Sequence, residues 1–357
     1  KAFDDLPVDL KNAMKLAFNR IKAFHEKQKL SGFDYVDEIG VNLGLKYSPI
    51  KRVGFYTPGG KALYPSSVLM NAIPALVAGV EERVLVSPIN IEKSSEILLA
   101  AAYLAEVTEF YRMGGAHAIA ALAFGTKDLK KVDKIVGPGN AYVAEAKRQL
   151  FGKVGIDSVA GPSEVLIVAD NKNNPEWIAI DLLSQAEHDE NAQSILITND
   201  KKFAKNVENQ IVKLLKTLPR KQIASSSWYN NGLILIIEHI NECIDLINQI
   251  APEHLELCIE NPKLYLDDIN NAGSIFLGNY TPEAIGDYIA GPNHVLPTEG
   301  TARFSSGLGT NDFLRRTTFV QCNEHNLNDL GKHAEILAEA EGLDAHRMSI
   351  YARRKDD

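Results

Sequence analysis

The feature that most constrains the fold is a repeated alternation of short β-branched runs with helix-like segments. From Arg52 onward, the runs GFYTP, RVLVSP, EFYRM and KIVGPG alternate with helices that we expect from Pro65 to Gly79 and from Ile91 to Leu104. Such an alternation predicts a parallel sheet that is covered by helices.

The same alternation then occurs a second time. The runs VLIVAD, SILITND, GLILIIE, LELCIE and SIFLGN follow one another, with helices expected near Trp177 to Ala186 and from Phe203 to Leu218. The pattern therefore predicts two similar α/β units, which we assign to residues 51–160 and 161–305.

The two ends of the chain lack this alternation. Residues 1–50 hold one amphipathic helical pattern, from Asn12 to Gln28, and then a polar loop, so we interpret them as a lead-in arm. In residues 306–357 the strand signals fade, and helical patterns cover NLNDLGKHAEILAEAEGL and Ala345 to Arg354. Two short helices have little core of their own, so this tail must dock on its own chain or on a partner subunit.

Composition and charge exclude several classes of function. The formal net charge of -8 gives nucleic-acid phosphates no general attraction. Three cysteines without paired spacing argue against a disulfide framework and a thiolate zinc site, and they favour a reducing cytoplasm. The apolar runs are far shorter than the roughly 18 residues that a membrane span needs. We therefore expect a small-molecule enzyme with no nucleic-acid or membrane partner.

A candidate metal site lies in the segment DLLSQAEHDENAQ. Gln185 and His188 stand three residues apart on the expected helix, so they share one face and can bind one cation. A solvated helix face is the ordinary alternative for such a pair. The metal hypothesis therefore needs further ligands.

Further candidates lie in loops and in the tail. Glu253 and His254 directly precede an apolar strand, and Asp287 lies in a loop that is rich in Gly and Pro. The tail adds Glu341 and His346, on either side of a glycine. Loops at strand ends commonly carry function. Each candidate also has a structural alternative: a helix cap and a surface imidazole for the adjacent pair, a turn for the aspartate, and a solvated side chain for the tail histidine.

Glycine-rich segments follow several expected strands, and their backbone amides could approach an anion. None of them matches the dinucleotide fingerprint G-x-G-x-x-G, because GPGNAY has Tyr142 where the third glycine belongs. Composition and spacing alone therefore lead to an α/β enzyme of two units and leave its metal dependence open.

Seven segments, taken together and in this order, resemble the histidinol dehydrogenase family: GFYTPGG, GPGNAYVAEAKRQ, AGPSEVLIVAD, LLSQAEHD, APEHLEL, NAGSIFLG and GDYIAGPNHVLPT. The resemblance runs from about Phe24 to Arg353, and part of the family's N-terminal region is missing. The chain also begins at Lys1 without an initiator methionine or a signal peptide, so we expect that residues are absent from its start.

The resemblance implies a fold and a reaction. The fold is two similar incomplete Rossmann-like domains with helical N- and C-terminal extensions, which intertwine two chains in a homodimer with shared active sites. The reaction is the zinc-dependent oxidation of L-histidinol to L-histidine through L-histidinaldehyde, with two NAD, in the last steps of histidine biosynthesis.

The resemblance also implies the site residues. The zinc ligands would be Gln185, His188, Asp287 and His346. The substrate contacts would be Ser163, Gln185, His188, His254, Asp287, Glu341 and His346. NAD would contact Tyr56, His117 and Asn140. His117 departs from the glutamine that is usual in the family, but a neutral imidazole can still donate one hydrogen bond.

The implied mechanism uses His254 as the base that takes the alcohol proton and Glu253 as the base that activates water for the second oxidation. Zinc would anchor and orient the substrate. Two alternatives remain: another zinc enzyme, such as a hydrolase with Glu253 as its base, and a catalytically silent binding subunit. The presence of all the matched metal and acid–base positions argues against the second, and production of NADH from histidinol separates the first.

Overall fold

The computed structural model describes residues 1–59, 64–89 and 96–354. These residues form two compact units. The first unit comprises Lys1–Gln28 and Ile50–Phe313, and the second comprises Lys29–Pro49 and Leu314–Asp357. Across the described ranges, no helix combines the length and the apolar character needed to cross a membrane.

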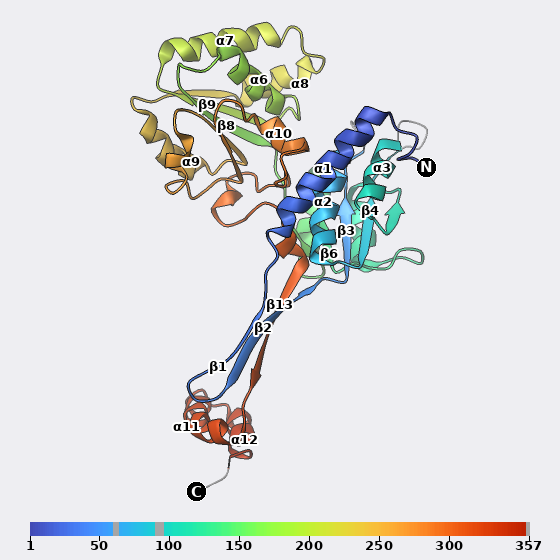
Figure 1. Cartoon of the computed structure of the whole chain (residues 1–357), viewed down its shortest axis with the longest axis vertical. Coiled ribbons are helices and arrows are strands. Elements are labelled where there is room, and N and C mark those ends of the chain that lie inside the picture. Colours follow the sequence, from blue (N-terminus) through green and yellow to red (C-terminus); the bar gives the residue numbers. More distant parts are fainter. Residues whose placement is uncertain (60–63, 90–95, 355–357) are drawn as a thin grey trace. The chain divides into compact units, whose positions relative to one another are not determined.

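The first lobe of the first unit is a parallel five-stranded sheet with the strand order β5-β4-β3-β6-β7. Register places Val53 beside both Arg83 and Lys134. The elements, several of which are labelled in Figure 1, are β3 (Arg52–Tyr56), α2 (Pro65–Ala78), β4 (Glu82–Val86), α3 (Glu96–Leu104), β5 (Glu109–Tyr111), α4 (Gly115–Phe124), β6 (Lys134–Val136), α5 (Ala141–Leu150) and β7 (Gly155–Ile156).

The second lobe repeats this topology, because its parallel five-stranded sheet has the order β10-β9-β8-β11-β12. Register places His254 beside Val165. The elements are β8 (Glu164–Ala169), α6 (Pro175–Ala186), β9 (Gln193–Thr198), α7 (Lys201–Leu214), α8 (Lys221–Asn231), β10 (Leu233–Ile236), α9 (Cys243–Ile250), β11 (His254–Cys258), β12 (Ser274–Leu277) and α10 (Glu283–Tyr288). Short 3-10 helices cover Ile240–Glu242, Pro262–Tyr265, Thr301–Arg303 and Thr310–Phe313.

The central strands of both lobes are buried along their whole length or nearly so. Parallel sheets carry helices on both faces, so such strands are continuously apolar rather than alternating. Helix starts follow local chemistry: Asn174 caps α6 ahead of Pro175, and Asp200 caps α7. The predicted α/β series with parallel sheets is therefore confirmed.

The helix expected from Asn12 to Gln28 is confirmed as α1 (Val8–Glu26). Its buried residues Met14 and Ile21 belong to the same apolar cluster as α2. The helix expected from Ile91 is described only from Glu96 to Leu104, and its predicted start lies outside the described residues.

The second unit is an antiparallel three-stranded sheet followed by two helices. Asn326 is buried and donates to the carbonyl of Gly40 across 2.8 Å, which ties the first of these helices to the turn between two strands. The elements are β1 (Phe33–Val36), β2 (Asn42–Pro49), β13 (Leu314–Gln321), α11 (Glu324–Ala340) and α12 (Asp344–Tyr351).

Two expectations for this unit were wrong. The segment interpreted as a polar loop holds β1 and β2, and β13 lies beyond Ser305, where the strand signals were expected to fade. β1 is exposed throughout and β13 almost throughout, so no buried face imposes an apolar alternation on their sequences. Pairing of the backbones defines these strands instead.

Candidate active site

In each sheet the strand that comes first in the chain, β3 or β8, is central. The strands that follow it lie first on one side and then on the other, so the strand order reverses between β3 and β6 and between β8 and β11. In open parallel sheets, ligands bind at the carboxyl ends of the strands at such a reversal. In the first lobe this crevice holds the loop from Gly137 to Asn140. Gly137 has φ +111°, and a Cβ there would lie 2.1 Å from the carbonyl oxygen of Tyr56, so only glycine fits.

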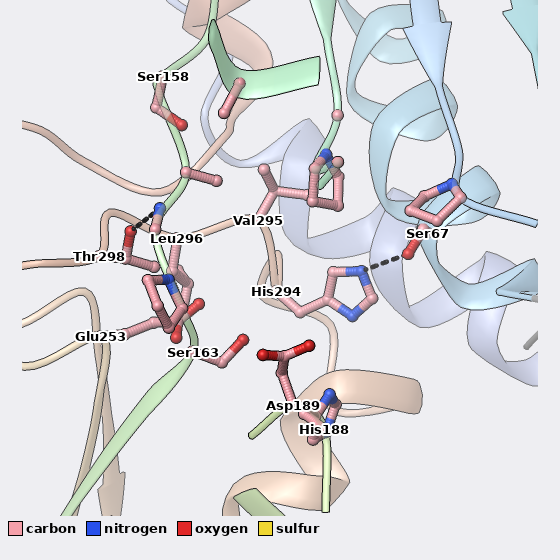
Figure 2. A pocket seen from close by; sticks show the side chains of 18 of the residues that line it. Ser67, Ser158, Ser163, His188, Asp189, Glu253, His294, Val295, Leu296 and Thr298 are labelled. Carbon is pink, nitrogen blue, oxygen red and sulfur yellow. Dashed lines mark hydrogen bonds between the residues drawn. The ribbon is translucent and has the colours of Figure 1, made fainter. Parts of the chain in front are cut away.

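A cavity of about 690 Å³ opens at this loop. Figure 2 shows Ser163, Glu253 and Thr298 on one side of it and Ser67 and His294 on the other. Its lining includes Ser67, Gly137, Pro138, Gly139, Asn140, Lys147, Asp157, Ser158, Ser163, Gln185, His188, Asp189, Glu253, His254, Glu283, Asp287, His294, Thr298 and Glu299.

His254 is the first residue of β11 and is buried, with 4% of its surface exposed. Its Nδ1 lies 2.9 Å from the carbonyl oxygen of Glu164, which can only accept a hydrogen bond. The proton of a neutral ring therefore sits on Nδ1. The Nε2 atom is buried and has no hydrogen-bond partner among the described residues; the nearest carboxylate oxygen, of Asp287, is 3.9 Å away. Burial lowers the pKa of His254, so the neutral ring is favoured.

Glu253 lies beside it and is also buried. Its Oε2 accepts a hydrogen bond from the backbone N of Glu164 at 2.8 Å and lies 3.6 Å from Nδ1 of His254. Burial raises the pKa of Glu253 well above its ordinary value, and nearby carboxylates act in the same direction. The arrangement holds one histidine and one carboxyl group at the amino-terminal edge of the second sheet.

Asp287 lies on the short helix α10, not in the loop that the sequence predicted. Its backbone carbonyl is 3.0 Å from Nδ1 of His294, whose Nε2 is 3.4 Å from Oγ of Ser67. Glu283, one helical turn earlier, is buried, and burial together with Asp287 raises its pKa to about 9.

Gln185 and His188 both line the cavity, but the helix prediction was wrong for His188. The helix α6 ends at Ala186, and the backbone N of His188 turns back to the carbonyl of Gln185 at 3.1 Å. Gln185 is buried, and its Oε1 has no hydrogen-bond partner in the described parts of the chain. A second group of possible metal donors is His254, Glu283 and Asp287, whose ligand atoms lie within 4.8 Å of one another.

Of the three residues expected to contact NAD, Asn140 lines the cavity and caps α5 by accepting from the backbone N of Val143. Tyr56 ends β3, and its hydroxyl accepts from the backbone N of Gly115 at 3.1 Å, at the start of α4. His117 lies on α4 and is exposed. Neither Tyr56 nor His117 is part of the cavity lining.

Glu341 and His346 belong to the second unit. Glu341 caps the end of α11 and His346 lies on α12; both are exposed. The helices are separated at Gly342, which has φ +71°. All described residues that line the cavity belong to the first unit, so these two residues are not among them.

Glu164, Glu283 and His294 are among the lining or supporting residues that the sequence did not predict. Glu283 stands four residues before Asp287, which is the spacing of one helical face, but the surrounding glycines and prolines favoured a loop. Glu164 acts on His254 through its backbone carbonyl, for which side-chain identity gives no signal.

Comparison with known proteins gives matches to one family over nearly the whole chain. The family model described as histidinol dehydrogenase matches residues 1–354. Histidinol dehydrogenase 1 of Trichormus variabilis is 57% identical over 345 residues, which are 97% of this chain and 80% of that protein. The histidinol dehydrogenase of Rhodospirillum rubrum is 56% identical, over 96% of this chain and 80% of its own length. The crystal structure of histidinol dehydrogenase from Elizabethkingia anophelis superposes with a TM-score of 0.93 at 41% identity, covering 99% of this chain and 82% of that one.

Proposed function

Because the chain belongs to the histidinol dehydrogenase family, we propose that its cavity is the active site in which L-histidinol is oxidised through L-histidinaldehyde to L-histidine, the last steps of histidine biosynthesis. The observation that carries the proposal is the buried His254, whose Nδ1 faces a carbonyl and whose Nε2 is left without a partner among the described residues.

We assign residues 51–160 and 161–305 to two incomplete Rossmann-like domains, with a lead-in arm over 1–50 and a tail over 306–357. The supporting observation is that the first strand of each series is central in its sheet, and that the later strands add first on one side of it and then on the other. We place NAD at the first domain, in contact with Tyr56, His117 and Asn140. When bound, NAD accepts a hydride in each of the two oxidations.

Zinc is the metal we propose, with Gln185, His188, Asp287 and His346 as its ligands. The set offers imidazole nitrogens and amide or carboxylate oxygens, which zinc accepts. The buried Oε1 of Gln185, which has no partner among the described residues, fits this role because a cation would satisfy it. When bound, zinc anchors the amino group and the imidazole of the substrate.

The alternative donor group, His254, Glu283 and Asp287, suits a metal less well. Without a metal, burial and Asp287 raise the pKa of Glu283 to about 9, so a cation would first have to displace a proton from this carboxyl group. A metal ligand must be deprotonated. The metal content of Glu283→Gln and of His188→Ala separates the two groups, because only the second variant should lose zinc.

In the first oxidation, His254 takes the alcohol proton. The ring donates Nδ1–H to the carbonyl of Glu164, so the lone pair is on Nε2 of a side chain that lines the cavity. Because burial lowers the pKa of the ring, it is neutral and able to accept a proton at neutral pH.

In the second oxidation, Glu253 activates the water that hydrates the aldehyde. Its raised pKa makes its carboxylate form a stronger base than an exposed glutamate. The backbone N of Glu164 fixes one oxygen of the carboxyl group. Ser163, which precedes β8 and lines the same cavity, would contact the substrate.

The decisive experiment is the absorbance of NADH after L-histidinol and NAD are added, with and without a chelator. We expect turnover that chelation abolishes and Zn²⁺ restores. No NADH would reject the proposed function and favour a hydrolase or a silent binding subunit. Undiminished activity in a verified metal-free sample would reject the metal.

We further propose a homodimer in which Glu341 and His346 complete the active site of the neighbouring copy. Glu341 at the end of α11 and His346 on α12 are exposed, and these two helices of the second unit also expose the apolar side chains of Ile336, Leu337 and Met348. A second copy of this chain would cover these side chains and bring the missing zinc ligand to the cavity.

Complementation tests the shared site. His346→Ala and His254→Asn chains should each be nearly inactive, but after joint unfolding and reassembly one site in each mixed dimer would be intact. With random pairing, activity should approach roughly a quarter of wild type for a two-fold dimer. Mixed dimers that are confirmed by mass but recover no activity would place His346 in the site of its own chain.

We propose a cytoplasmic location for this enzyme. Cys243, Cys258 and Cys322 are free thiols, which suits a reducing compartment.

A further inference from the structure

A buried ion pair forms part of the cavity wall in the first lobe. Lys147 on α5 and Asp157 after β7 have side chains that are only 2% and 5% exposed, and Nζ lies 2.5 Å from Oδ1. Both residues line the cavity. Nothing in the proposed chemistry of the second lobe uses this pair.

The pair forms hydrogen bonds with both backbone groups of one residue, Gly137. Oδ2 of Asp157 accepts from the backbone N of Gly137 at 2.7 Å, and Nζ of Lys147 donates to its carbonyl oxygen at 3.0 Å. Gly137 is the start of the loop that reaches Asn140, and a Cβ added at this position would clash with the backbone of Tyr56. The ion pair therefore determines the conformation of this loop at its tightest point.

The charges of the pair also matter at this position. The carboxyl ends of β3, β6 and β7 are where an open parallel sheet receives a dinucleotide, and the phosphates of NAD are negative. An unpaired Asp157 carboxylate at this edge would repel them, because buried charges are screened weakly. Lys147 cancels this charge while it holds the loop.

We propose that Lys147 and Asp157 are positioning residues for the dinucleotide: they hold the loop from Gly137 to Asn140 in its NAD-binding conformation and keep that edge of the sheet electrically neutral. This inference rests on the proposed function, since it assumes that NAD binds in the first lobe.

The test compares NAD affinity among three variants of the full-length, metal-loaded protein. Lys147→Met removes the hydrogen bond to the carbonyl of Gly137 and leaves the Asp157 carboxylate without its cation. The KM for NAD should therefore rise by at least about tenfold, with a much smaller change in kcat at saturating NAD. Lys147→Met/Asp157→Asn leaves no unpaired buried charge, so its KM for NAD should lie between those of Lys147→Met and wild type. A repulsion effect requires this order.

Lys134→Met is the matched control. Lys134 also forms a part-buried pair, with Asp312 at 3.4 Å, but it stands at the opposite end of β6. It should lower the melting temperature and leave the KM for NAD unchanged. If Lys147→Met and the double variant behave as this control does, the pair serves stability alone and the inference is wrong.

Calorimetric titration with NAD separates this inference from the proposed function and does not need turnover. Wild-type protein that binds NAD but does not oxidise histidinol would reject the function and leave the inference standing. Wild-type protein that oxidises histidinol, together with folded double variant of unchanged NAD affinity, would reject the inference alone. The double variant covers the case in which Lys147→Met does not fold.

Discussion

The two lobes have the same strand order but use opposite edges of their sheets. The first lobe turns the carboxyl ends of its strands to the cavity, through the backbone of the loop from Gly137 to Asn140. The second lobe contributes Ser163, Glu253 and His254, which lie at the amino ends of β8 and β11. One topology thus supplies a backbone surface in one lobe and reactive side chains in the other.

The two lobes also differ in whether a buried carboxyl group has a cationic partner. In the first, Asp157 is paired with Lys147. In the second, no lysine or arginine in the described ranges pairs with Glu253, Glu256 or Glu283, and burial raises the pKa of each of them. A lysine beside a buried carboxylate stabilises its charge, whereas burial without such a partner favours proton uptake by the carboxyl group. We infer that the first lobe is built for binding and the second for proton transfer.

The largest effect should come from the second lobe. His254→Asn should remain folded and zinc-loaded, and histidinol oxidation should slow by roughly 10²–10⁴, the usual contribution of a positioned base. NADH formation measures the rate, and calorimetry should show unchanged NAD affinity. His239→Asn, at an exposed histidine of the same lobe, is the control. A comparable loss of NAD affinity in His254→Asn would break the division between the lobes.

An intermediate effect should come from the first lobe. Gly137→Ala would place a Cβ 2.1 Å from the carbonyl oxygen of Tyr56, so the loop must move, and the KM for NAD should rise on the order of tenfold. Gly152→Ala is a matched control, because Gly152 also has a positive φ, +93°, but no atom lies within 4 Å of its Cβ position.

Both glycine variants should lose about 1–3 kcal/mol of stability through backbone strain. Only Gly137→Ala should change NAD affinity. Equal KM values for NAD in the two variants would show that the close approach to Tyr56 has no part in binding.

The smallest expected effect comes from the buried carboxyl groups that no lysine or arginine in the described part of the chain pairs with, and it is measured on thermal stability. Burial raises the pKa of Glu256 to about 8, above its ordinary value of 4.5. The folded protein then holds a proton that the unfolded chain releases, so this contribution to stability is complete below about pH 4.5 and is lost as pH rises through about 8. Glu256→Gln keeps an acceptor for the backbone N of Glu283 but has no proton to lose. The melting temperature of the variant, relative to that of wild type, should therefore increase as pH rises across this window.

Glu260→Gln is the control for that series. Glu260 follows the same strand but is exposed, and Lys172 lowers its pKa, so it titrates below this window. Thermal melts at several pH values measure the difference. Parallel curves for wild type and Glu256→Gln would show that this carboxyl group is not protonated in the folded protein.

Much of the fold was predictable because it depends on local patterns. The buried strands of the two sheets are apolar runs bounded by glycine and polar residues, and the helices between them carry caps that the sequence shows, such as Asn174 and Asp200. The strands of the second unit were not predictable in this way, because β1 and most of β13 bury no face.

The site was predictable only in part. Glu253 and His254 stand before an apolar strand, which marked them as candidates, but the tautomer of His254 depends on a carbonyl that is 90 residues away in the chain. The tail residues Glu341 and His346 were candidates from the sequence pattern, but their roles, like that of the exposed His117, came from the family resemblance and stay predictions.

The sequence by itself determined the two α/β series, the family, and the candidate side chains Gln185, His188, Glu253, His254 and Asp287. Those properties depend on residue identity and on spacing along the chain. Only the tertiary structure decided which edge of each sheet meets the cavity, and that Lys147 and Asp157 close on Gly137 from two different elements. The physical reason is that hydrogen bonds, burial and shifted pKa values depend on distances between segments far apart in the chain, and local patterns carry no record of those distances.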